Sequence, residues 1–187
     1  TFLFYKRPFV SWLEPPFGQA AGGERAVIVH GRDFSDEHNG LLCFAGGRPA
    51  PTKFLSSGLV ECTLTPIEEG SLTIRISNNN GTDASQEEVL YTFVPPITLN
   101  GTSPRSIPTT GGTTVAVFGE GFIDSGAMAC KFGHDKSGLV PATFISSQEI
   151  ICLAPAADIA GRISLTVTSN HFDFIKSSLV TVTYYDA

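Results

Sequence analysis

The chain has 187 residues, of which 42% are apolar and only 16% charged, a balance that excludes a disordered acidic tail. Twelve Lys and Arg against 18 Asp and Glu give a net charge of −6, which argues against a duplex nucleic-acid binder and against electrostatic docking on an anionic membrane. No apolar run approaches the about 20 residues that a membrane helix needs. Frequent Gly and Pro separate short segments rich in Val, Ile, Thr and aromatic residues, a pattern that predicts an all-β protein.

The sequence repeats itself at an offset of about 89 residues, which is the length of one small β domain. The repeat predicts two tandem domains, residues 9–95 and 96–187, joined by a stiff Pro pair at Pro95 and Pro96. The matched residues are Pro15 and Pro104, Gly31 and Gly119, Phe34 and Phe122, Cys43 and Cys130, and Cys62 and Cys152.

The start of the chain resembles the end of the first repeat. Residues 3–10 are similar to residues 90–97, where the last strand of a domain leads into the linker. We therefore interpret residues 1–8 as a strand that belongs to a preceding domain or to a neighbouring subunit. The alternative is an extra N-terminal strand packed on the first domain.

Alternating apolar and polar residues predict antiparallel strands with one wet face. In residues 161–168, Ile163, Leu165 and Val167 are expected to point inward, and Ser164, Thr166 and Thr168 outward. Similar segments recur through both repeats, at residues 26–31, 72–76, 113–119 and 179–185. About seven short strands in each repeat are typical of an immunoglobulin-like β-sandwich.

Four cysteines lie at matching places, two in each repeat. Four cysteines allow three disulfide connectivities, and the repeat selects one, because each domain must fold alone. That connectivity pairs Cys43 with Cys62 and Cys130 with Cys152. Disulfides imply an oxidising compartment; the alternative is four reduced, buried thiols. A zinc site is not favoured, because no Cys-x-x-Cys spacing occurs and the four His do not recur at matched positions.

The order of motifs resembles the IPT/TIG domain, an immunoglobulin-like sandwich of plexins, Met-type receptors and other surface proteins. The resemblance covers residues 10–185 and is carried best by the second repeat, although Asp33 of the first repeat replaces Gly121 of the second. The family's paired cysteines agree with the pairing above. The residues that carry the resemblance are Pro104, Gly111, Gly112, Val115, Val117, Gly119, Gly121, Phe122, Cys130, Phe132, Gly133, Phe144, Ile150, Cys152, Pro155, Gly161 and Val167.

Two Asn-x-Thr sequons begin at Asn80 and Asn100, and both are candidate N-glycosylation sites. Asn80 ends an Asn-Asn-Asn-Gly turn and should be exposed. Asn100 follows the Pro pair. Glycosylation at these two positions would agree with passage through the secretory pathway.

Three aromatic residues are candidate contact residues. Trp12 follows the unassigned N-terminal strand among several prolines, where it would either contact a preceding domain or lie exposed. Phe172 and Phe174 flank Asp173 near the last hairpin and could form an exposed pair. The alternative for Phe172 and Phe174 is packing in a core or hinge.

No catalytic motif, cofactor-binding motif or metal-ligand motif is present in the sequence. Asp33, Asp36, Glu37 and His38 are interpreted as a solvated polar loop, and residues 134–136 as another. We therefore expect a non-catalytic module without a cofactor or metal, extracellular or at the cell surface, which serves adhesion, a receptor ectodomain or a stalk.

Two further hypotheses remain open. The chain could be an accessory carbohydrate-binding module of a secreted enzyme, with the three aromatics as sugar platforms. It could also be a filament subunit, if the first residues complete a sheet of a neighbour. The expected partners are proteins or neighbouring repeats, with glycans as a further option, and neither nucleic acid nor inserted membrane. The intracellular, DNA-binding version of the resembled family fits poorly with the acidic charge and paired cysteines.

Overall fold

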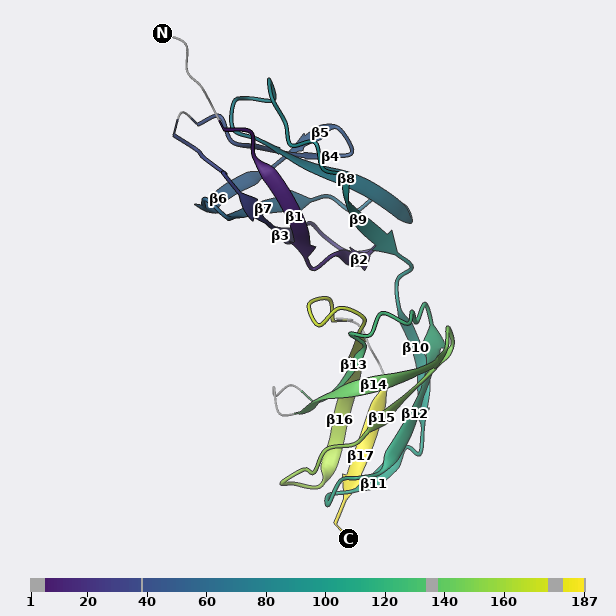
Figure 1. Cartoon of the computed structure of the whole chain (residues 1–187). Coiled ribbons are helices and arrows are strands. Elements are labelled where there is room, and N and C mark those ends of the chain that lie inside the picture. The colour runs from purple at the N-terminus through teal and green to yellow at the C-terminus, as the bar shows by residue number, and fades with distance from the viewer. Residues whose placement is uncertain (1–5, 38, 134–137, 175–179, 187) are drawn as a thin grey trace. The chain divides into compact units, whose positions relative to one another are not determined.

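A computed structural model describes residues 6–37, 39–133, 138–174 and 180–186. The chain divides into two compact units, Thr1–Val94 and Pro95–Ala187, which are called the first and second domains (Figure 1). Strands and connecting loops account for the described residues, and no α-helix is found among them. The part of the chain described here therefore offers no helix long and apolar enough to cross a membrane.

The first domain consists of two facing sheets (Figure 1). One has four strands in the order β1-β3-β7-β6, and the other has five in the order β2-β9-β8-β4-β5. The strands are β1 (Phe9–Glu14), β2 (Phe17–Gln19), β3 (Arg25–Arg32), β4 (Leu42–Ala45), β5 (Arg48–Ala50), β6 (Thr52–Ser56), β7 (Leu59–Leu64), β8 (Gly70–Ser77) and β9 (Val89–Val94).

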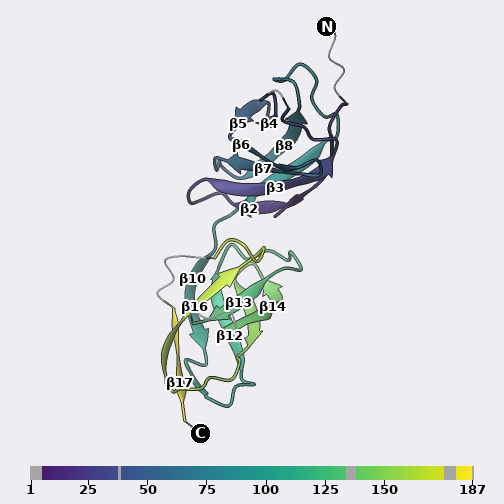
Figure 2. The ribbon, with the colours of Figure 1, turned by 90° about the vertical axis from the view of Figure 1, so that its left-hand side faces the viewer.

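The second domain repeats this arrangement, with one difference of connection. Its strands follow one another in the order β10-β12-β15-β14-β13-β16-β17-β11, and Figure 2 shows β16 beside its partner β17. The strands are β10 (Thr98–Ser103), β11 (Ser106–Pro108), β12 (Thr114–Glu120), β13 (Ala129–Phe132), β14 (Leu139–Ser146), β15 (Glu149–Leu153), β16 (Gly161–Thr168) and β17 (Thr181–Tyr185).

Strand β14 belongs to both sheets of the second domain. Its first residues, from Leu139, pair with β13, and those from Ala142 pair with β15. In the first domain the same path is broken into β5 and β6 at Pro51. A proline cannot donate to a strand ladder. Pro51 lies between β5 and β6, whereas Pro141 lies within the continuous strand β14.

The apolar alternation of the sequence fills one core in each domain. Ile74, Ile76, Leu165 and Val167 are fully buried at the predicted inward positions, and burial of such side chains stabilises each sandwich. Thr168 is an exception, because it was expected outward and is fully buried. Its hydroxyl can be buried at low cost because it hydrogen-bonds the Asn170 side chain at 3.3 Å. The predicted all-β class with two tandem immunoglobulin-like sandwiches is confirmed.

The first strand of each repeat is divided between the two sheets. Strand β1 pairs antiparallel with β3, whereas β2 pairs parallel with β9. Likewise β10 pairs with β12, and β11 pairs parallel with β17. The change of sheet falls at the cis peptide bonds Glu14–Pro15 and Ser103–Pro104. The two parallel pairs were not predicted from the sequence.

The predicted N-terminal strand lies mostly at residues 1–5, which are outside the described residues. Residues 6–8 lead into β1 without pairing in a sheet. The assignment of residues 1–8 to a preceding domain or neighbouring subunit therefore stays a prediction, and so does the filament hypothesis that depends on it.

Candidate interaction surfaces

Each domain has one disulfide that joins its two sheets. Cys43 of β4 is bonded to Cys62 of β7, and Cys130 of β13 to Cys152 of β15, with Cα–Cα distances of 6.0 and 6.3 Å. All four side chains are buried. The two bonds lie at matching places of the two sandwiches and require formation in an oxidising compartment.

In the acidic loop of the first domain, the Asp33 carboxylate takes part in two ion pairs. The Asp33 carboxylate lies 3.6 Å from Lys6 Nζ and 3.8 Å from Arg32 Nε. Among the described residues no group of three or more His, Cys, Asp or Glu could hold a metal ion. His38 and residues 134–136 lie outside the described residues. Asp33 has a φ of 60°, the left-handed conformation that Gly121 also adopts at 78°, so the two repeats share this turn despite the different residue.

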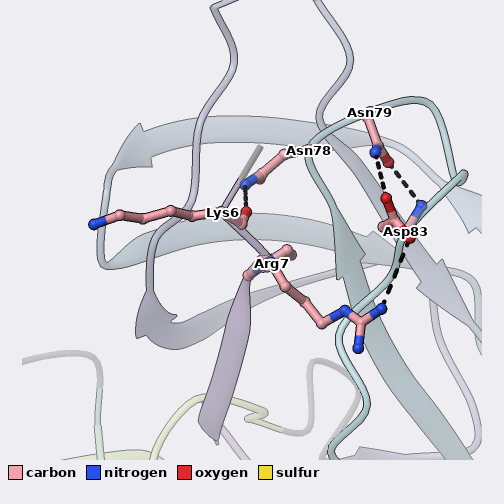
Figure 3. A pocket seen from close by; sticks show the side chains of 6 residues that line it. Lys6, Arg7, Asn78, Asn79 and Asp83 are labelled. Atoms are coloured by element: carbon pink, nitrogen blue, oxygen red, sulfur yellow. Dashed lines mark hydrogen bonds and ion pairs between the residues drawn. The ribbon is translucent and has the colours of Figure 1, made fainter. Parts of the chain in front are cut away.

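A hollow of about 250 Å³ lies where the chain enters the first domain (Figure 3). It is lined by Lys6, Arg7, Pro8, Asn78, Asn79 and Asp83. Figure 3 shows Arg7 reaching Asp83, at 3.7 Å. Both side chains are half exposed, so this ion pair contributes little to stability.

The firm contact in this hollow comes from Asn78, whose side chain is buried. Its Nδ2 donates to the Lys6 carbonyl at 3.2 Å and to the Asp33 carbonyl at 2.7 Å, while its Oδ1 accepts from the Ser35 backbone N–H at 3.1 Å. The Asn78 side chain thus links the backbone of Lys6 to the backbone of Asp33 and Ser35. Residues 6–8 thus form part of the wall of the hollow.

Trp12 lies on the outer face of the edge strand β1. The pairing with β3 is shifted between Val10 and Trp12, so that Ser11 is the extra residue of a β-bulge. The bulge reverses the alternation: Val10 is buried in the core and Trp12 is 50% exposed. Trp12 therefore lies at the surface of the first domain, and its contact with a preceding domain stays a prediction.

The indole of Trp12 stacks on the imidazole of His30, with ring centroids 3.6 Å apart and planes 10° apart. His30 Nε2 lies 3.0 Å from the Glu14 carboxylate. One rung along the same two strands, the guanidinium of Arg32 lies 4.1 Å from the centre of the Phe9 ring. We call the outer surface formed by these five residues the tryptophan face.

Phe172 and Phe174 lie on a pinned turn of the second domain. The Oδ1 of Asn170 accepts hydrogen bonds from the backbone N–H groups of Phe172 and Asp173, at 3.0 and 2.8 Å. Phe172 is 56% exposed. Phe174 is partly buried, and Lys131 Nζ lies 5.3 Å from its ring centre. The sequence prediction of an exposed pair therefore applies to Phe172, whereas Phe174 packs with a neighbouring cation.

Both sequon asparagines are exposed. Asn80 lies in a turn with a φ of 56°, as the Asn-Gly sequence suggests. Asn100 lies on the edge strand β10, where the pairing with β12 shifts between Leu99 and Gly101. It is the extra residue of that bulge, so its backbone is outside the regular ladder. Both sites are accessible for a glycan.

Sequence reasoning missed His30, Glu14 and Asn78. The alternation of residues 26–32 places His30 on the outer face, which was a usable signal. Its contact with Trp12 depends on the bulge at Ser11, for which the sequence gives no cue. Asn78 was one of three consecutive Asn residues, and only the folded chain distinguishes it as the buried one.

Comparison with known proteins places this architecture in a family. A family model described as "IPT/TIG domain" matches residues 8–93 and, a second time, residues 97–184. No curated protein matches the chain. Two structures of the plexin A4 full extracellular region are similar, with TM-scores of 0.60 and 0.52 and identities of 16% and 19%. They cover 98% and 96% of this chain, which spans 16% and 18% of theirs. At this identity the likeness shows the fold alone.

Proposed function

Because the chain belongs to the IPT/TIG domain family, we propose that it is a non-catalytic interaction module within a larger, extracellular tandem-repeat protein. Adhesion, receptor recognition and a stalk between binding domains are the roles that such a module serves. Both disulfides support this location, since they persist in the oxidising conditions outside the cell. The two sequons are consistent with the same route.

The observation that carries the proposal is the presentation of large aromatic side chains on fixed elements. Trp12 and Phe172 are 50% and 56% exposed. Trp12 is held by a stacked ring on a paired strand, and Phe172 by hydrogen bonds in its turn. Aromatic residues held in place lose little conformational entropy on binding and are frequent hot spots of interfaces.

The proposal is tested by cell-surface binding. The chain is produced by secretion and fused to a tetramerisation tag to raise its avidity. Its binding to cells of the source organism is then measured by flow cytometry. Trp12→Ala or Phe172→Ala should reduce the signal at least about tenfold, as for an interface hot spot, while Leu90→Ala, an exposed aliphatic residue on β9, serves as the control. Substrate turnover that a single polar substitution abolishes would overturn the proposal.

One observation favours a second candidate, the carbohydrate-binding accessory module. A flat, exposed indole beside a carboxylate is a surface on which a sugar ring can stack and donate hydroxyl hydrogen bonds. This candidate predicts binding of neutral oligosaccharides at Trp12. A glycan array probed with the wild type and with Trp12→Ala separates it from the first proposal.

A further inference from the structure

The tryptophan face shows how the first domain covers a ring next to the bulge of its edge strand. Ser11 is the extra residue of β1, and Trp12, which follows it, pairs directly with His30 of β3. The indole lies flat on the imidazole, with ring centroids 3.6 Å apart. The side chain that follows the bulge thus covers the ring on the neighbouring strand, as a cross-strand pair on one face of a sheet does.

The second domain has the same bulge but no side chain after it. Asn100 is the extra residue of β10, and Gly101, which follows it, pairs directly with Phe118 of β12. A Cβ atom added to Gly101 would meet no heavy atom within 4 Å, so the space for a side chain is open. Phe118 is 40% exposed. An uncovered aromatic ring therefore lies beside an empty position on the outer face of the sheet.

The residue before this empty position is the asparagine of a sequon. In a β-bulge two residues oppose one residue of the partner strand, so Asn100 and Gly101 both lie beside Phe118. Asn100 is exposed, and neighbouring Cα atoms are only about 3.8 Å apart. A glycan attached to Asn100 therefore begins within reach of the uncovered ring.

The first sugar of an N-linked glycan, N-acetylglucosamine, is chemically suited to an exposed aromatic ring. Its ring substituents are all equatorial, so each face of the sugar presents axial C–H groups, which are apolar and slightly positive. The face of an aromatic ring carries the negative part of its quadrupole, and covering it removes apolar surface from water. The sugar hydroxyls lie at the rim of such a stack, where they stay hydrated. A sugar ring can therefore take the place of the indole.

We infer that Phe118 is a docking site for the N-acetylglucosamine attached to Asn100, which takes the position that Trp12 occupies in the first domain. The sugar is tethered beside the ring, so its effective concentration there is high and a weak contact is sufficient to hold it. The docked sugar holds the start of the glycan on the outer face of the second domain. The contact requires glycosylation of Asn100, but it is separate from Trp12 and Phe172, which carry the proposed interaction function.

The contact is tested on the full chain with Asn80→Gln, secreted from eukaryotic cells and trimmed by an endoglycosidase to one isotope-labelled N-acetylglucosamine at Asn100. In NMR spectra of this glycoform, the ring current of Phe118 should move the C–H proton signals of the sugar upfield. Phe118→Thr, which places a β-branched residue in the strand, should abolish the shift. The matched control is Leu153→Thr, at a 58% exposed position of the same sheet face, which should leave the shift unchanged.

The same glycoform measures what the contact contributes to local stability. Opening of β10 and β12, followed by hydrogen exchange, should be about threefold rarer with the sugar than in Asn100→Gln. In Phe118→Thr this effect of the sugar should be lost. Gly101→Tyr keeps the sequon and places the chain's own ring over Phe118, so there the sugar should lose both its upfield shift and its stabilising effect.

Three results would overturn the inference. The first is a secreted chain without a glycan at Asn100, and the second is a set of sugar signals that is the same with and without the Phe118 ring. The third is an equal stabilising effect of the sugar in Phe118→Thr, which would show that the glycan acts through its bulk. All three results leave the proposed interaction function standing, because binding at Trp12 or Phe172 does not involve this sugar.

Discussion

Asn80 and His171 occupy the same position in the two repeats. Each lies three residues after the end of a matching strand, β8 or β16, and their φ angles are 56° and 63°. The residue that follows is Gly81 in the first domain and the exposed Phe172 in the second. One turn geometry therefore presents a glycosylation sequon in one domain and an aromatic side chain in the other.

The edge strands β1 and β10 also carry a sequon in one domain and an exposed aromatic residue in the other, but here the sequon is in the second domain. The bulge of β10 places Asn100 where the bulge of β1 places Ser11, directly before the exposed Trp12. Each sequon thus lies at a position where the other domain has an exposed aromatic beside it. A glycan on Asn100 would also block strand addition at the β10 edge. The arrangement leaves one aromatic surface uncovered on each domain.

Both sequons should be occupied when the chain is expressed through a eukaryotic secretory pathway. Their exposure and irregular backbone make the two side chains accessible. Intact mass before and after enzymatic glycan removal should differ by two glycans, and by one in Asn80→Gln or Asn100→Gln. No mass change on the secreted material would contradict the prediction. Gln86→Asn, which creates no sequon, is the control.

Replacing Asn78 by alanine should destabilise the first domain by about 2–3 kcal/mol. The change removes hydrogen bonds at 3.2, 2.7 and 3.1 Å, each of them partly buried, and takes the Asn78 partner from three backbone groups. Urea unfolding measures the loss. The exposed amide of Gln86 provides a matched control, and Gln86→Ala should change stability by less than about 0.5 kcal/mol. A similar small change in Asn78→Ala would show that the entry segment is held elsewhere.

The sequence was sufficient to predict the two sandwiches because the apolar alternation that marks their strands is local and recurs in both repeats. Alternation predicts which residues of β8 and β16 are buried, and the matched cysteines predict the disulfides that join the two sheets. Tertiary context decides the exceptions. Thr168 is buried because Asn170 supplies its hydroxyl with a partner, which no periodicity can reveal.

The surfaces were less predictable because they depend on bulges and on long-range contacts. Strict alternation would place Val10 and Trp12 on one face, and the extra residue Ser11 separates them. The contact from Asn78 to Lys6 spans 72 residues of sequence. The sequence identified Trp12 and Phe172 as candidates, but their exposure follows only from the fold.

Removing either disulfide should cost about 3 kcal/mol of unfolding free energy. The bonded cysteines are 19 and 22 residues apart, so the chain-entropy contributions differ by only about 0.1 kcal/mol. Cys43→Ala with Cys62→Ala, and Cys130→Ala with Cys152→Ala, should therefore lower stability about equally in denaturant titrations. A loss confined to one pair would indicate that the other relies on packing alone.

Alkaline pH should destabilise the second domain through Tyr184. This side chain is 2% exposed, and its hydroxyl donates to the Pro155 carbonyl at 2.8 Å. Burial raises the pKa of Tyr184 above its ordinary value of 10.0. The contribution to stability is complete below pH 10, where folded and unfolded chains are both protonated. It is lost as the pH rises through the folded-state pKa, because the unfolded chain releases its proton first.

Tyr184→Phe should remove this pH dependence. At neutral pH the variant loses the hydrogen bond to Pro155, at a cost of about 1 kcal/mol. As the pH rises above 10 the wild type loses stability faster, so the difference between the two proteins should narrow. Tyr185→Phe, at a 47% exposed position, should keep the wild-type slope. Urea unfolding from neutral to strongly alkaline pH measures all three proteins, and an unchanged alkaline slope in Tyr184→Phe would contradict the assignment.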